Sequence, residues 1–250
     1  MPVAAALAAL LLVTAPAGAG AAPALETARA LIERYDQDPT RIDRARDLLE
    51  AELTRERRVE TMILASRVHF LYGEVRAATD AEKLAAYDRG REWGRRAVEL
   101  APRSEEAHVW YAINTGRWGQ TKGIMRSLFL LPTVREELDI ILGLNPRSVR
   151  GHALAGNVFF ELPALLGGDR RKAEEHYRKG LAVDPRFTVL RVDLARLLVA
   201  EGRVDEARRE LRRVIEETAP TSPADWTVRD LPRARALLDT LDRQTSRSPR

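Results

Sequence analysis

The chain has 250 residues, of which 45% are hydrophobic and 31% charged, and lysine and arginine outnumber aspartate and glutamate by 41 to 37. Alanine, leucine, arginine and glutamate predominate, which argues against a sheet-rich fold, and the small basic surplus is interleaved with acidic residues rather than gathered into a nucleic-acid-binding surface. The sequence has no cysteine, which excludes disulfides, thiolate metal sites and a lipid-modified cysteine.

Residues 1–22 have the features of an export signal. An apolar run at residues 3–13 is followed by Pro16 and by small residues that permit cleavage after Ala19 or Ala21. As a helix, that run would extend only about 16 Å, against a hydrocarbon core of roughly 30 Å, so it does not predict a membrane span. We therefore expect a periplasmic or otherwise exported protein whose mature chain begins near Pro23. No basic residue precedes the apolar run, which leaves open an upstream start or a retained anchor.

The rest of the chain has the pattern of paired helices. Residues 24–35, 41–52, 59–75 and 81–100 predict two pairs of irregular repeat form. Three amphipathic segments align with one another and close with a break at Pro102, Pro146 and Pro185, and the pattern is more regular from residue 105. Equivalent positions lie 44, 39 and 34 residues apart, at Ala97, Ile141, Gly180 and Val214.

A spacing of about 34 residues is that of the tetratricopeptide repeat, so the first two intervals carry insertions. The sequence predicts an all-α, tetratricopeptide-like solenoid of helix pairs with lengthened repeats. Its expected parts are a signal peptide (1–22), N-terminal helix pairs (23–104), tetratricopeptide-like repeats (105–218), a C-terminal capping helix (224–243) and a disordered tail (244–250).

The two insertions, GQTKGIMRSLFLLP and ELPALLGGD, are more apolar than solvated connections. Their leucines and phenylalanine either lengthen two helix pairs and pack on one another, or form a contact between subunits. Mutual packing is expected for most of them. Phe129 and Leu165 are the candidates left for an interface.

Residues 105–217 resemble the tetratricopeptide T-component family associated with TRAP transporters. The resemblance lies in AHVWYAINTGRWGQTKG, in LFLLP and, most specifically, in GNVFFELPALLGGDRRKAEEHYRKGLAVDP. It implies an exported accessory to solute uptake that partners a periplasmic substrate-binding protein, forms a homo-oligomer and encounters a small organic ligand. A more distant resemblance, to the microtubule-dynamics regulator family, covers the same tryptophan-containing helix and the next repeat, but the export signal argues against that role.

The concave face of such a solenoid is formed by fixed positions of each first helix. These positions give the groove candidates Ile113, Arg117, Arg150, Asn157, Phe160, Glu161, Val192 and Arg196. An aromatic residue with flanking charges suits a peptide or small ligand, although Phe160 could equally be core. A peptide-carboxylate clamp built from lysine and asparagine is not expected, because Ala153 and Asp193 stand at two of its positions.

The densest polar and aromatic cluster is a second binding candidate, formed by Trp110, Asn114, Arg117, Trp118 and Lys122. At about 100° per residue, Asn114, Arg117 and Lys122 cannot share one helix face. We therefore expect this cluster to serve two surfaces.

No catalytic constellation is evident. His108 and His152 occupy a packing position between helices, and Asp169 after two glycines suits a helix N-cap rather than a phosphate loop. Without a nucleophile, a metal-ligand set or paired carboxylates, the sequence predicts a non-enzymatic binding or adaptor protein with no cofactor and no metal. The alternative function is a protein–protein scaffold of the cell envelope that binds no small molecule. Neither function involves nucleic acid.

Overall fold

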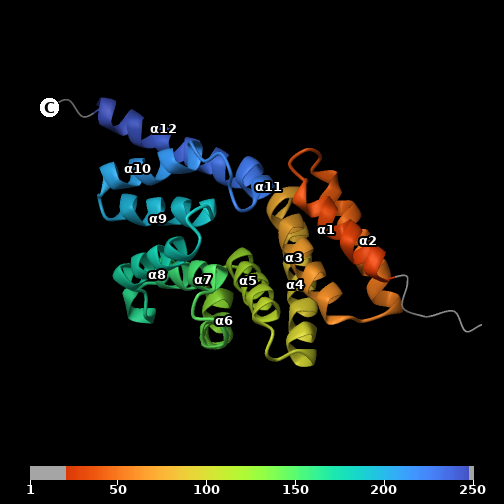
Figure 1. The fold of residues 1–250 in the computed structure, drawn as a ribbon. Coiled ribbons are helices and arrows are strands. Elements are labelled where there is room, and N and C mark those ends of the chain that lie inside the picture. Colours follow the sequence, from red (N-terminus) through yellow and green to blue (C-terminus); the bar gives the residue numbers. More distant parts are fainter. Residues whose placement is uncertain (1–20, 248–250) are drawn as a thin grey trace, which may run out of the picture.

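The computed structural model describes residues 21–247, which form helices and turns without a strand (Figure 1). The expected all-α helix-pair solenoid is confirmed. Most of the predicted signal peptide, residues 1–20, and the end of the predicted tail, residues 248–250, lie outside the described residues. No helix among residues 21–247 is long and apolar enough to cross a membrane.

The N-terminal helix pairs are packed around one large core. They comprise α1 (Ala21–Glu33), α2 (Thr40–Arg55), α3 (Val59–Leu71), a π-helical turn η1 (Tyr72–Arg76) and α4 (Asp80–Leu100). A reciprocal capping box fixes the start of α4: the Thr79 hydroxyl accepts from the Glu82 amide, and the Glu82 carboxylate accepts from the Thr79 amide. Helix α3 is buried on most of its circumference, because α2, α4 and α5 all pack against it.

The central pair shows what the first insertion does. Helix α5 (Glu105–Lys122) turns at Gly123, whose φ of 110° favours glycine, into α6 (Ile124–Leu144). The insertion is therefore not an irregular connection, since it forms the end of α5 and the start of α6, with Pro132 inside the second helix.

The last two pairs follow the tetratricopeptide pattern. They are α7 (Val149–Glu161) with α8 (Arg170–Val183), and α9 (Thr188–Ala200) with α10 (Val204–Ile215). The second insertion forms a 3₁₀ turn, η2 (Ala164–Leu166), and Asp169 caps α8 by accepting from the Lys172 amide at 3.1 Å. Helices α7 and α8 approach closely at Gly156, where a Cβ would lie 2.2 Å from the Tyr177 ring.

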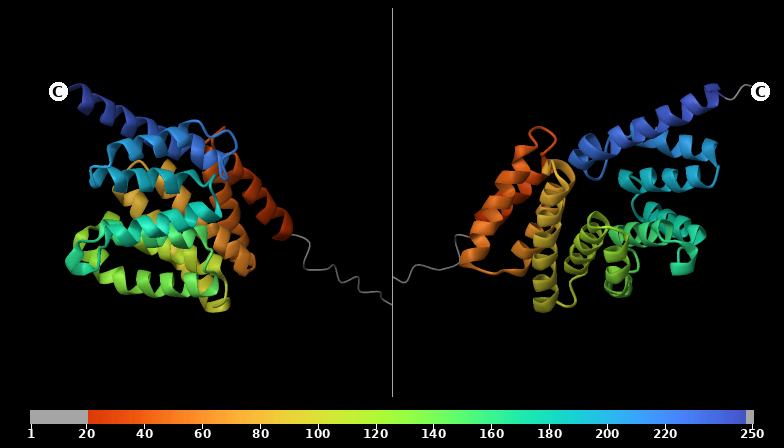
Figure 2. Two further views of the ribbon diagram at one scale, coloured as in Figure 1. Left: turned by 60° about the vertical axis from the view of Figure 1, so that its left-hand side comes forward. Right: turned by 180° about the vertical axis from the view of Figure 1, so that it is seen from behind.

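The C-terminal segment folds back across the concave side of the solenoid. It comprises α11 (Pro223–Asp225), the π-helical turn η3 (Trp226–Asp230) and α12 (Leu231–Arg247), so the final helix extends past residue 244, where the tail was expected to begin. Figure 2 shows α12 along α10 at one end, while α11 reaches the N-terminal helices at the other. The predicted capping helix thus belongs to a segment that bridges the two ends of the solenoid.

Candidate functional site

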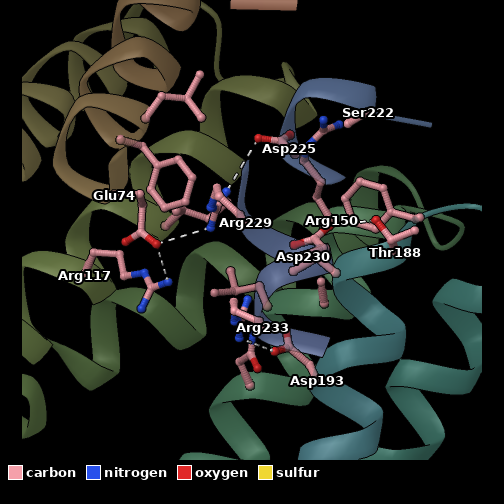
Figure 3. A pocket seen from close by; sticks show the side chains of 18 of the residues that line it. Glu74, Arg117, Arg150, Thr188, Asp193, Ser222, Asp225, Arg229, Asp230 and Arg233 are labelled. Carbon is pink, nitrogen blue, oxygen red and sulfur yellow. Dashed lines mark hydrogen bonds and ion pairs between the residues drawn. The ribbon is translucent and has the colours of Figure 1, made fainter. Parts of the chain in front are cut away.

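The bridging segment covers one side of the concave groove and leaves a half-open cavity of about 820 Å³. Its walls come from α3, η1, α5, α7 and α9 on the solenoid side, and from residues 222–233 on the other (Figure 3). This volume lies within the range of about 300 to 1,000 Å³ typical of ligand pockets. One cavity therefore collects side chains from nearly the whole length of the chain.

Glu74 organises the N-terminal wall of the cavity. Its carboxylate lies 3.1 Å from Arg117 and 3.2 Å from Arg229 (Figure 3). It also accepts a hydrogen bond from the Tyr87 hydroxyl at 2.7 Å. Burial raises the pKa of Glu74, but the guanidinium groups of Arg117 and Arg229 outweigh burial and hold that pKa below its ordinary value. The carboxylate is thus ionised and its charge is compensated within the wall.

Asp193 organises the opposite wall. Its carboxylate lies 3.3 Å from Arg233 and 3.5 Å from Arg196, and Arg196 also pairs with Glu161 at 2.8 Å. Asn157 donates to Asp193 at 3.3 Å and accepts from the Tyr177 hydroxyl at 2.8 Å. Asp193 stands where a peptide-carboxylate clamp would have an asparagine. It is already paired with two arginines of this chain.

Two further arginines line the cavity without a carboxylate partner among the described residues. The Arg150 guanidinium lies over the Trp110 ring at 5.6 Å and the Phe187 ring at 5.5 Å, and Arg67 lies over Trp110 at 5.8 Å. Burial, followed by the like charge of Arg67, lowers the pKa of Arg150. The aromatic faces offset part of the cost of holding these cations out of water.

Asp230 is the least compensated acid in the cavity wall. It is 2% exposed; one carboxylate oxygen accepts from the Thr188 hydroxyl at 2.7 Å, and the other, Oδ1, has no hydrogen-bond partner. Burial raises the pKa of Asp230 to about 6.

Comparison with known proteins identifies the family. The family model described as regulator of microtubule dynamics protein 1-3 matches residues 24–165, more than half of the chain. The chain belongs to this regulator of microtubule dynamics family. A tetratricopeptide repeat model also matches residues 164–226, so the two models together span all of the repeats and reach the bridging segment.

Individual relatives are more distant. The chain is 25% identical to regulator of microtubule dynamics protein 3 of Rattus norvegicus over 125 residues, and 26% identical to that of Bos taurus over 120 residues. These matches cover 47% and 45% of this chain and 26% of each relative, so the matched part spans about a quarter of either relative's length.

The fold also has a solved counterpart. A thermophilic tetratricopeptide repeat protein from Thermus thermophilus superposes with a TM-score of 0.65 and 24% identity, covering 87% of this chain and 99% of that one. This similarity shows the fold. The more distant of the two resemblances seen in the sequence therefore names the family, while no comparison bears on the TRAP association.

In this family member, several predicted groove residues do line the cavity. These are Ile113, Arg117, Arg150, Asn157, Glu161 and Arg196. The other two predicted groove residues do not: Val192 is in the core, and Phe160 packs against the C-terminal core with Arg196 over its ring at 5.5 Å. Phe160 therefore packs in the core, the alternative to a groove position that the sequence left open.

The tryptophan-centred cluster divides as its helical angles predicted. Trp110 and Arg117 face the cavity, whereas Asn114 is fully buried and donates to Ser66 across the α3–α5 contact. Trp118 and Lys122 lie elsewhere, with the Trp118 ring beneath Arg91 at 4.7 Å and Lys122 at 5.9 Å. Only two of the five residues of this candidate site therefore line the cavity.

The N-terminal and C-terminal walls were not anticipated. Phe70, Glu74, Asp225, Arg229 and Asp230 line the cavity from segments whose repeat pattern is irregular. The one available signal was the adjacent charged pair Arg229 and Asp230 near the start of the capping element.

The histidines have packing roles. His108 is 2% exposed and contacts Glu137 at 2.5 Å and the Pro102 carbonyl oxygen at 3.0 Å. The His152 ring lies 3.1 Å from the His176 ring, nitrogen to nitrogen, and burial lowers the pKa of both. Within residues 21–247, no group of three or more histidines or acids is placed to hold a metal ion.

A separate apolar surface lies at the two insertions. Ile124, Met125, Phe129 and Leu165 are 78%, 81%, 72% and 99% exposed. Leu128, Leu130, Leu131 and Leu162 are half-buried. Leu166 is also exposed, at 38%. The insertions are thus only partly packed, and the two interface candidates, Phe129 and Leu165, remain on the surface.

Proposed function

We propose that this regulator-family protein is a non-catalytic binding protein that receives an extended segment of a protein partner in its half-open cavity. The observation that carries this proposal is the cavity itself, which is enclosed by elements from both ends of the chain and lined by aromatic rings and paired charges. Aromatic faces give a peptide apolar contact area, and fixed charged groups orient its polar atoms.

Gly116 offers a direct way to test the cavity. It lines the cavity, and a Cβ added there would meet no atom within 4 Å, so Gly116→Phe places a large side chain at the cavity wall from an uncrowded backbone position. Gly143→Phe is the matched control, because a Cβ at Gly143 also meets nothing within 4 Å and this helical residue is exposed outside the cavity.

The probe is a pair of random synthetic decapeptide mixtures, one with free C-terminal carboxylates and one amidated. Each is incubated with the full chain, and retained peptides are sequenced by mass spectrometry. We expect the parent and Gly143→Phe to retain a common set of peptides that Gly116→Phe loses. Retention of the same set by all three proteins, or of no peptide by the parent, would overturn the proposal.

The resemblance to the T-component family supports a more specific second candidate. In it, the protein is exported, assembles into a homo-oligomer and serves as an accessory to TRAP-type solute uptake through a periplasmic substrate-binding protein. A cell-envelope scaffold with no small-molecule ligand is its alternative. The support is the string LPALLGGDRRKAEEHY together with the signal-like residues 1–22.

Fractionation tests this candidate. Intact mass of the protein expressed in its own host should give a periplasmic chain beginning near Pro23. A full-length chain in the cytoplasmic fraction would contradict both export and the uptake role. Adjacent genes for TRAP membrane and binding proteins would favour uptake over a scaffold.

A further inference from the structure

Arg150 and Arg67 are unusual in the wall of this cavity, because most of its other charges form ion pairs. Six arginines and five acids line this space, and the acids Glu74, Glu161, Asp193 and Asp225 are all engaged by Arg117, Arg196, Arg229 or Arg233. No ion pair or hydrogen bond within residues 21–247 engages the guanidinium of Arg150 or of Arg67.

No acid among the described residues forms an ion pair with Arg150, although Asp225, Glu106 and Glu105 lie close enough to act on its charge. Asp225 acts on Arg150 through space, but its carboxylate accepts from the Tyr35 hydroxyl at 2.7 Å and lies 3.6 Å from Arg229. Figure 3 shows Arg150 on the same side of the cavity as Ser222 and Asp225. Two like charges therefore share the Trp110 ring, which is an unfavourable arrangement unless an anion joins them.

The geometry points to a carboxylate site. Arginine presents a planar fork of donors that matches a carboxylate, and its flat faces stack on aromatic rings, as Arg150 does with Trp110 and Phe187. We propose that Arg150 and Arg67 bind a carboxylate of the partner segment, either an aspartate or glutamate side chain or a C-terminal carboxylate. This inference rests on the proposed function, since it specifies what the cavity selects.

The location differs from that of a lysine–asparagine carboxylate clamp. At the clamp positions this chain has Ala153 and Asp193, and Asp193 is paired with Arg233 and Arg196. The unpaired cations lie instead at the start of α7 and within α3, between the repeats and the N-terminal pairs. An acidic group would therefore bind at Arg150 and Arg67 rather than at the two clamp positions.

The decapeptide mixtures test the inference at a first level. Among peptides that require an open cavity, as judged by loss with Gly116→Phe, we expect enrichment of aspartate, glutamate or a free C-terminus. The amidated mixture separates the two sources: enrichment that persists there comes from side chains, and enrichment that disappears there comes from the terminus. Cavity-dependent peptides with no acidic preference in either mixture would overturn this inference and leave the proposed function standing. The absence of any cavity-dependent peptide would overturn both.

Substitutions test it at a second level, with the strongest retained peptide and its neutral amide analogue measured by fluorescence anisotropy. Arg150→Gln should weaken binding of the acidic peptide by about tenfold to a hundredfold, the range of a charge-assisted hydrogen bond. Binding of the neutral analogue should be unaffected. Arg147→Gln is the control, because Arg147 is exposed in the turn before α7. Arg67→Gln serves as the second variant.

A stability measurement separates this role from a structural one. Removing an unpaired, largely buried cation should leave the melting temperature of the free protein unchanged or higher. A lower melting temperature for both Arg150→Gln and Arg67→Gln, with equal loss of acidic and neutral peptides, would assign these arginines to the fold and contradict the carboxylate site.

Discussion

The Tyr35 hydroxyl donates a 2.7 Å hydrogen bond to the Asp225 carboxylate, although the two residues are 190 positions apart. Tyr35 is 1% exposed, and burial followed by the Asp225 charge raises its pKa, so the hydroxyl remains a donor. Together with the Glu74–Arg229 pair, this bond fixes the bridging segment against the N-terminal helices. An open repeat array lacks such a bond, because each repeat contacts only its neighbours.

Glu74 joins the N-terminal helices to the bridging segment, so removing its charge should lower the stability of the protein. Glu74→Gln removes the carboxylate closest to Arg229, whose side chain is 15% exposed. It also removes the ion-pair partner of Arg117. We expect the free energy of unfolding to fall by about 1 to 3 kcal/mol in urea titrations. Glu99→Gln is the control, since Glu99 forms a surface pair within α4 and is 55% exposed. Equal midpoints for the two variants would show that the bridge contributes little stability.

The last repeat depends on a close helix crossing. Ala207 is fully buried in the C-terminal core, so Ala207→Leu adds methylenes where no space exists and should cost about 1 to 3 kcal/mol of unfolding free energy. Ala236→Leu, at an exposed position of the adjacent α12, should leave the urea midpoint nearly unchanged. A parent-like midpoint for Ala207→Leu would mean that the repeat register is wrong.

These core positions show how far the sequence could predict the structure. The regular repeats were predictable because small residues such as Ala207 and prolines such as Pro185 mark each crossing and each helix end. Bridging contacts such as Tyr35–Asp225 were not predictable, because they join irregular segments at a sequence distance that no local pattern encodes. Consequently the sequence predicted one wall of the cavity, including Arg117 and Asn157, and missed the wall that encloses it.

Asp230 should give the protein a pH-dependent stability. Its pKa of about 6 lies above the ordinary 3.8, so the folded state binds a proton more tightly than the unfolded chain. The resulting stabilisation is complete below about pH 3.8 and is lost as pH rises through 6, a change on the order of 3 kcal/mol. Asp230→Asn should therefore gain stability relative to the parent between pH 4.5 and 7.5 in urea titrations.

The control for this titration is Asp88→Asn, because Asp88 is 56% exposed on α4. Its difference from the parent should stay flat over the same pH range. A flat difference for Asp230→Asn as well would show that Asp230 is ionised at little cost in the folded protein.

The exposed insertions make a prediction about assembly. Phe129 and Leu165 are 72% and 99% exposed, and a contact between copies of the chain would cover them. If this surface is the interface of the proposed homo-oligomer, Phe129→Glu and Leu165→Glu should lower the mass measured by size exclusion with light scattering, while the melting temperature remains that of the parent. A parent that is already monomeric at high concentration would exclude the contact.

Backbone amide hydrogen exchange, with and without the strongest cavity-dependent peptide, tests the central claim that both ends of the chain form one binding site. The account predicts slower exchange on binding in two separate segments at once, residues 67–74 of α3 and η1 and residues 222–233 of the bridging segment. The apolar surface at residues 124–129 and 164–166 should be unchanged. Protection confined to that surface, or to one end of the chain alone, would contradict the account.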